Sequence, residues 1–228
     1  MKLKSLVVAL AAAAACLPAM SATIYSNDFE ANAAGISGAG SLQGTQGYSG
    51  QGYGRQFLRN DAGGNPQTAS VLSLNLAGAA TGAMLSLDLG IIDSWDGFNC
   101  CGPDFFNVKV DGVTVFSQIF DSFGVPTLHS ALVTKAYGVG LGFNSWNDGA
   151  YLLTLGLGNL AAGAHSIKFF ASGGWQAGFD ESWGIDNVLV TGNFSNPIPE
   201  PETYALMLAG LGVVAAVARR RRSRKASG

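Results

Sequence analysis

The stretch that decides the fold is Phe105-Phe-Asn-Val-Lys-Val110, Asp111-Gly112, Val113-Thr-Val-Phe116. Two runs of alternating character flank a two-residue Asp-Gly. This arrangement is the strongest short-range signal for a β-hairpin. The stretch therefore predicts two antiparallel strands, 105–110 and 113–116, joined by a tight turn.

The segments around this hairpin show the same two-residue period. Val71–Leu76 and Met84–Leu89 each place three leucines on one face. Further short runs of strand character cover 23–25, 151–157, 165–170 and 184–190. No segment of the body has a sustained helical period, and glycine is abundant. The pattern predicts an all-β fold, an antiparallel β-sandwich of the jelly-roll kind over residues 23–195. Gly35–Gly54, poor in apolar residues, is expected to be a long exposed loop.

The first 22 residues are expected to be a secretory signal peptide. Lys2 and Lys4 precede an apolar run over 6–17, and small residues surround the expected cleavage site at 19–22. The run is too short to span a bilayer, and its order of parts is that of an export signal.

The last 33 residues, 196–228, form a three-part tail. Pro199-Glu200-Pro201 precedes a largely apolar segment, Thr203–Ala218, which is expected to form a single hydrophobic helix, and a basic stretch covers 219–225. Proline excludes the first part from a helix interior, and basic residues favour the cytoplasmic face of a membrane. The tail is either a sorting signal or an ordinary permanent membrane anchor.

The tail resembles the PEP-CTERM sorting signal of exopolysaccharide-producing Gram-negative bacteria. Its matching residues are Pro199, Glu200, Pro201, Arg219, Arg220, Arg221 and Arg222. The resemblance implies that an exosortase, an integral-membrane enzyme, recognises the tail and cuts near Pro-Glu-Pro. It also implies export, transient anchoring of the C-terminal helix in the inner membrane, and release to the cell surface or medium.

The body between the two targeting segments is acidic. It holds five of the thirteen Lys and Arg residues but thirteen of the fifteen Asp and Glu residues, for a net charge near −8. Nucleic-acid binding needs basic patches, so this charge argues against a nucleic-acid partner. An acidic body suits divalent cations instead.

Two groups of oxygen-bearing side chains are candidate calcium ligands. The first is Asp93, Asp96 and Asp104, close to Asn99 in the connection between two predicted strands. Calcium accepts six to eight oxygen ligands in flexible geometry, and such a loop could supply several. The alternative is an Asx-rich loop whose carboxylates cap local amides.

The second group is built on Asp186, at the start of the last predicted strand. Either register of that strand turns a polar side chain inward, and an inward carboxylate needs a cation or backbone amides. The pair Glu30 and Asp186, with Asp28, resembles the jelly-roll carbohydrate-binding modules in which two such acids share a structural calcium ion. Asp186 could instead cap a turn. The body also resembles exported proteins that share the Asp-Glu-Ser-Trp-Gly-Ile-Asp-Asn-Val ending.

Cys100 and Cys101 are adjacent, and Cys16 lies in the expected signal peptide. After export the pair could form a vicinal disulfide, remain as two thiols, or bridge to another chain.

Binding or structure is a better-supported role than catalysis. Both histidines, His129 and His165, lack a metal-binding neighbourhood, and no catalytic residue is predicted. Aromatic side chains could stack on sugar rings, Trp95 and Trp183 among them, or could belong to the core. The candidates are Tyr48, Tyr53, Trp95, Trp146, Trp175 and Trp183. We therefore expect a non-catalytic surface or biofilm-matrix protein that binds polysaccharide. The alternatives are a purely structural component and, third, a glycoside-active enzyme.

Overall fold

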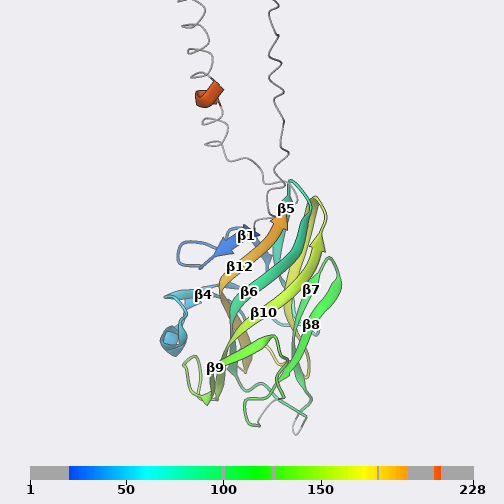
Figure 1. Ribbon diagram of the computed structural model, residues 1–228. Helices are drawn as coiled ribbons and strands as arrows, with labels where there is room; N and C mark the ends of the chain where they lie inside the picture. Colours follow the sequence, from blue (N-terminus) through cyan, green and yellow to red (C-terminus); the bar gives the residue numbers. More distant parts are fainter. Residues whose placement is uncertain (1–20, 99–100, 125–126, 179, 195–207, 212–228) are drawn as a thin grey trace, which may run out of the picture. The chain divides into compact units, whose positions relative to one another are not determined.

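The computed structural model describes residues 21–98, 101–124, 127–178, 180–194 and 208–211. Residues 21–194 fold as two antiparallel β-sheets (Figure 1). The strands are β1 (Ser21–Asn27), β2 (Ile36–Gly38), β3 (Ser41–Gly44), β4 (Gln56–Asn60), β5 (Ser70–Leu76), β6 (Ala80–Asp93), β7 (Asp104–Val110), β8 (Val113–Phe120), β9 (Leu132–Val139), β10 (Asp148–Leu160), β11 (Gly163–Gly173) and β12 (Glu181–Phe194). One 3-10 helix, η1 (Gln46–Gln51), lies between β3 and β4.

The strand order is that of a jelly roll. One sheet has seven strands in the order β3-β4-β12-β6-β10-β9, with β1 also paired to β12, and the other has five in the order β2-β5-β11-β7-β8. Within them, β4-β12-β6-β10 faces β5-β11-β7-β8, so the chain passes repeatedly from one sheet to the other. The predicted antiparallel sandwich of jelly-roll type is confirmed.

Local sequence explains the central strands. Asp111 and Gly112 have φ of 49° and 85°, the left-handed pair that a two-residue hairpin turn between β7 and β8 requires. The leucines of β5 and β6 point between the sheets, as their spacing predicts. The core also takes residues from four other strands: Phe106, Val108, Leu153, Leu155, Ile167, Phe169, Ile185, Val188 and Val190.

A bulge in β12 changes which residues face the core. Ile185 and Val188 both lie in the core, although an unbroken strand would turn them to opposite faces. The register against β6 shifts between Asp186 and Leu189, and Asn187 has a φ of 49°. Asp186 is consequently buried on the outer face of the seven-stranded sheet, while the hydrophobic residues before and after it face inward.

The expectation of an irregular loop over Gly35–Gly54 is wrong, although more than half of these residues are exposed, as expected. The segment contains β2, β3 and η1, and Tyr48 is fully buried against the outer face of the seven-stranded sheet. Gly90 and Gly184, paired across β6 and β12, leave room there for the Tyr48 and Phe57 rings. Although the segment is poor in apolar residues, the rings of Tyr48 and Tyr53 pack it against the sheet.

Strand pairing defines two ends of the sandwich. At the terminal end, Ser21 pairs with Asn193 and Phe194 with Ala80. At the loop end, Glu181 pairs with Asp93. β1 includes Ser21 and Ala22, which were assigned to the signal peptide.

Of the predicted hydrophobic helix 203–218, only residues 208–211 are among those described, and they are helical. No helix in the described part of the chain is long and apolar enough to cross a bilayer. Pro199-Glu200-Pro201 and the basic stretch 219–225 lie outside the described residues.

Candidate functional site

Three carboxylates from separate segments meet at the loop end. Asp96 follows the end of β6, Asp104 begins β7 and Glu181 begins β12. One oxygen of each lies within 4.8 Å of the other two. Because β7 and β12 belong to different sheets, these three residues, here called the acidic cluster, bridge the sandwich.

The acidic cluster is buried and incompletely hydrogen-bonded. Asp104 and Glu181 are 0% and 1% exposed, and no N–H or O–H group of the described residues donates to Asp104 Oδ1 or Glu181 Oε1. The two carboxyl groups can hydrogen-bond only to each other there, which requires a proton on one of them. Their other oxygens accept bonds from the backbone N–H groups of Asp96 (2.5 Å) and Gln176 (2.6 Å). No ion pair between described residues includes any of the three carboxylates.

Burial raises the pKa of all three carboxyl groups. The charge of Asp104 raises the pKa of Glu181 further, and the charges of Asp180 and Asp121 do the same for Asp96. A cation would reverse this balance, since a nearby positive charge favours the ionised form. The arrangement is also too closed for glycoside hydrolysis, because two almost fully buried carboxyls leave no space for a sugar between them.

The sequence predicted Asp93 as a member of this group, but the structure does not bring it together with the other carboxylates. Asp93 lies opposite Glu181 across the β6–β12 pair but is not in the acidic cluster. Burial and the charge of Asp148 raise its pKa to about 7. Glu181 was missed because only the pairing of β12 with β6 brings it to this loop. The one signal in the sequence that could have indicated Glu181 was its position as an acid at the start of the last strand, β12.

The connection that carries Asp96 also carries the two adjacent cysteines. Cys101 is disulfide-bonded, while Cys100 and Asn99 lie outside the described residues. The vicinal disulfide stays a prediction.

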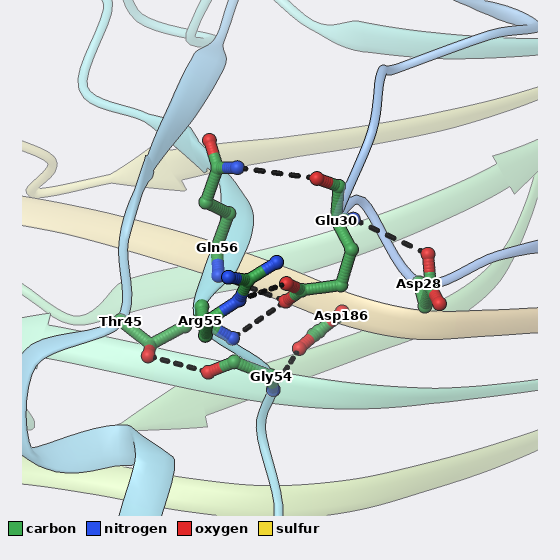
Figure 2. A network of polar contacts seen from close by, with 7 residues as sticks. All are labelled: Asp28, Glu30, Thr45, Gly54, Arg55, Gln56 and Asp186. Atoms are coloured by element: carbon green, nitrogen blue, oxygen red, sulfur yellow. Dashed lines mark hydrogen bonds and ion pairs between the residues drawn. The ribbon is translucent and has the colours of Figure 1, made fainter.

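Glu30 and Asp186 do converge, on the backbone of Gly54 (Figure 2). Glu30 Oε1 accepts bonds from the N–H groups of Arg55 (2.5 Å) and Gln56 (3.0 Å), and Arg55 Nε donates to Oε2 at 3.0 Å. These bonds, the one from Gln56 foremost, lower the pKa of Glu30.

Asp186 is satisfied in a similar way. Its Oδ2 accepts the Gly54 N–H at 2.8 Å and its Oδ1 accepts that of Asn187 at 2.7 Å, although burial still raises its pKa to about 6. Asp28 Oδ1 accepts the Glu30 N–H at 3.2 Å. The bulge turns Asp186 to the outer face of the sheet and not inward as the sequence predicted, and backbone amides meet the buried carboxylate there, one of the two expected solutions. Calcium at Glu30, Asp186 and Asp28 stays a prediction, and Arg55 already supplies a positive charge there.

Most of the predicted sugar-contacting aromatics are in the core. Trp95 and Trp183 are 0% exposed, and their N–H groups donate to Ser182 O (2.8 Å) and Gln67 Oε1 (2.6 Å). Neither ring can present a face to a ligand, so their assignment as ligand-binding residues is corrected. Tyr48, Tyr53 and Trp175 are buried as well.

Trp146 is different, because 48% of it is exposed at the loop end. Its ring contacts that of Phe123, which is 57% exposed, edge to face with centroids 5.6 Å apart. Trp146 lies between β9 and β10 and Phe123 between β8 and β9. Sequence reasoning named Trp146 but gave no reason to single out Phe123.

The neighbours of these two residues hold the loops to the sandwich. Asn147 Nδ2 donates to Ser122 O at 3.2 Å, and the Ser122 N–H donates to Trp95 O at 2.8 Å. Ser122 Oγ donates to Asp93 O at 2.6 Å. The exposed pair is therefore connected to the same β6–β7 connection that supplies Asp96.

Comparison with protein families bears on the tail. Residues 197–222 match the PEP-CTERM protein-sorting motif. This match covers all of the Pro-Glu-Pro residues and the four arginines identified from the sequence. No curated protein matches the chain.

Solved structures similar to the body include carbohydrate-binding modules. A family 35 module from an environmental isolate has 21% identity over 71% of this chain and 90% of its own, with a TM-score of 0.37. A family 35 module from Clostridium thermocellum has 14% identity over 75% and 100%, with a TM-score of 0.40. The CBM22-1 xylan-binding domain from Paenibacillus barcinonensis Xyn10C has 11% identity over 78% and 98%, with a TM-score of 0.37. At these values the similarities say nothing about the ligand of the present chain.

Proposed function

We propose that this protein is exported, processed at its PEP-CTERM motif by an exosortase, and displayed at the cell surface or in the extracellular matrix. The match over 197–222 supports this proposal, as does the basic-then-apolar order of the first 22 residues. The motif is the part of the chain that the processing enzyme would recognise.

We further propose that the sandwich is a non-catalytic module that binds polysaccharide through Phe123 and Trp146. The observation that carries this proposal is their exposure as a contacting pair, since solvent-facing aromatic rings offer flat apolar faces. A sugar ring has apolar C–H faces that such rings can cover. The pair is also well positioned, because hydrogen bonds tie its loops to buried residues, which lowers the ordering cost of binding.

The charge of the body narrows the ligand class. A net charge near −8 repels acidic polymers, so neutral polysaccharides are the expected partners. The wholly structural alternative predicts no glycan binding at all.

The test is a glycan array followed by affinity electrophoresis in gels containing the bound polysaccharide. We expect Trp146→Ala and Phe123→Ala to weaken binding by about tenfold or more, the usual effect of removing an aromatic anchor. Val113→Ala is the matched control, because Val113 is 67% exposed beside the β7–β8 turn, away from the loop end.

The proposal is supported if the polysaccharide gel slows the migration of wild type and Val113→Ala but not that of Trp146→Ala. Failure of the wild-type protein to bind any neutral or acidic glycan would favour a structural role. Polysaccharide cleavage that is lost on mutating a named carboxylate would revive the enzyme alternative.

A further inference from the structure

We propose that the acidic cluster of Asp96, Asp104 and Glu181 binds one calcium ion, which links the two sheets at the loop end. This inference is independent of polysaccharide binding and concerns a site distinct from the Glu30–Asp186 pair.

The unpaired oxygens carry the proposal. Asp104 Oδ1 and Glu181 Oε1 are buried, and among the described residues no N–H or O–H donor reaches either oxygen, so the two carboxyl groups could only share a proton with each other. Both belong to residues whose carboxylates lie within 4.8 Å of that of Asp96. Buried polar atoms are normally paired, so two unpaired acceptors at one place indicate a missing positive partner. The Glu30–Asp186 pair shows the opposite condition, because its oxygens already accept N–H groups.

The donor set fits a hard cation. Three carboxylates supply three negative charges and only oxygen ligands, whereas zinc prefers nitrogen and sulfur. Calcium tolerates irregular geometry and completes its six to eight ligands with backbone oxygens and water, while magnesium needs a near-ideal octahedron. The three carboxylates come from separate segments on two sheets, an irregular arrangement that calcium accepts more readily than magnesium does.

The competing explanation is a shared proton. A protonated Glu181 could donate to Asp104 without any metal. One proton would leave two of the three carboxylates charged, however, with the negative charges of Asp121 and Asp180 also acting on Asp96. A divalent cation compensates more of this charge than a proton does.

Terbium provides a direct probe of the site, because it replaces calcium and is excited through nearby tryptophan. Trp95 adjoins Asp96 in the chain, and its ring lies 5.3 Å from that of Trp175. We expect the mature domain to show tryptophan-sensitised terbium emission that excess calcium abolishes. Isothermal titration with calcium should show a binding site that Glu181→Gln removes.

Thermal unfolding tests the same site by another route. Calcium at about one hundred times its Kd should raise the Tm by about 5–10 °C relative to chelator. Glu181→Gln, which keeps an acceptor for Gln176, and Asp96→Asn should abolish both the emission and the Tm shift. Glu30→Gln is the matched control, since it neutralises an acid in the other predicted calcium site and should leave both unchanged.

Two results would overturn the proposal. An unchanged wild-type Tm in calcium, together with a higher Tm for Glu181→Gln in chelator, would show that the shared proton is correct. Loss of the calcium response in Glu30→Gln, with its retention in Glu181→Gln and Asp96→Asn, would place the ion at Glu30 and Asp186. Neither result depends on glycan binding.

Discussion

At the scale of single residues, two glycines of the seven-stranded sheet, Gly90 and Gly184, have no side chain, and this allows the 45–57 segment to cover the outer face of the sheet. A Cβ at Gly184 would lie 2.1 Å from Phe57 Cε2, and one at Gly90 would lie 2.9 Å from Tyr48 Cε1. Ala150 pairs with Gly90 on the adjoining strand. Three small residues in a row across three strands thus form a flat floor for two aromatic rings.

Adding one methyl group to this floor should be costly. We expect Gly184→Ala to lower the free energy of unfolding by about 1–3 kcal/mol, because the Phe57 ring must move and the packed interior resists overfilling. Urea denaturation measures the change. Gly156→Ala is the control, since its Cβ would meet only Met84 Sδ, at 3.9 Å, and should change stability by less than about 0.5 kcal/mol. Equal stability of the two variants would contradict the packing described for Phe57.

The same scale shows where sequence reasoning about the site stopped. Asp96 and Asp104 could be proposed because they are near each other in the chain. Glu181 could not, because its approach depends on β12 pairing with β6. Burial of Trp95 was one of two alternatives that the sequence left open, since nothing local distinguishes a tryptophan under a loop from one above it.

At the scale of elements, strands with regular alternation could be predicted and irregular segments could not. The leucines of β5 and β6 and the Asp111-Gly112 turn behave as their spacing indicates. The bulge at Asp186 and Asn187 lies where the Gly54 N–H donates to Asp186, a contact between distant parts of the chain. η1 has no periodic signal and is held by Tyr48, whose hydroxyl donates to Ile91 O at 2.7 Å.

The connection between β1 and β2 is tied to the start of β4 by Glu30, and this tie can be tested. Glu30→Ala removes the acceptor for the Arg55 and Gln56 N–H groups, so we expect a lower urea midpoint and faster proteolysis within 45–55. Asp28→Ala, which removes one 3.2 Å bond, should change both much less.

Measuring the stability of Glu30→Ala both in calcium and in chelator shows whether hydrogen bonds or a calcium ion account for the loss of stability. If hydrogen bonds alone hold Glu30, Glu30→Ala will lower the urea midpoint by the same amount in calcium and in chelator. A loss seen only in calcium would instead support the ion predicted at Glu30 and Asp186.

At the scale of the whole molecule, negative and positive charges lie in different parts of the chain. The formal charge of −2 combines an acidic body with basic termini that processing is expected to remove. The sandwich class could be predicted because alternation recurs in many segments. The jelly-roll order is set by long-range pairings, such as β4 and β6 on either side of β12, that no local pattern encodes.

Cleavage of the tail should lower the mass of the mature chain by an amount that can be measured. In a host with an exosortase, we expect intact-protein mass spectrometry of the mature chain to show an end near Pro199–Pro201 and no Arg219–Arg222. The same chain expressed without the exosortase should retain the arginines. Arginines retained in both hosts would identify the tail as a permanent anchor.

The pairing of β1 with β12 has a consequence for how the protein is presented. Since Ser21 lies opposite Asn193, a tether at either terminus holds the sandwich by the same pole. β6, with 14 residues, separates that pole from the other by roughly 45 Å at about 3.3 Å per residue. The exposed aromatic pair and the buried acidic cluster therefore lie at the end of the sandwich away from both Ser21 and Phe194, so cutting or keeping the tail would alter the attachment of the domain without altering the end that carries them.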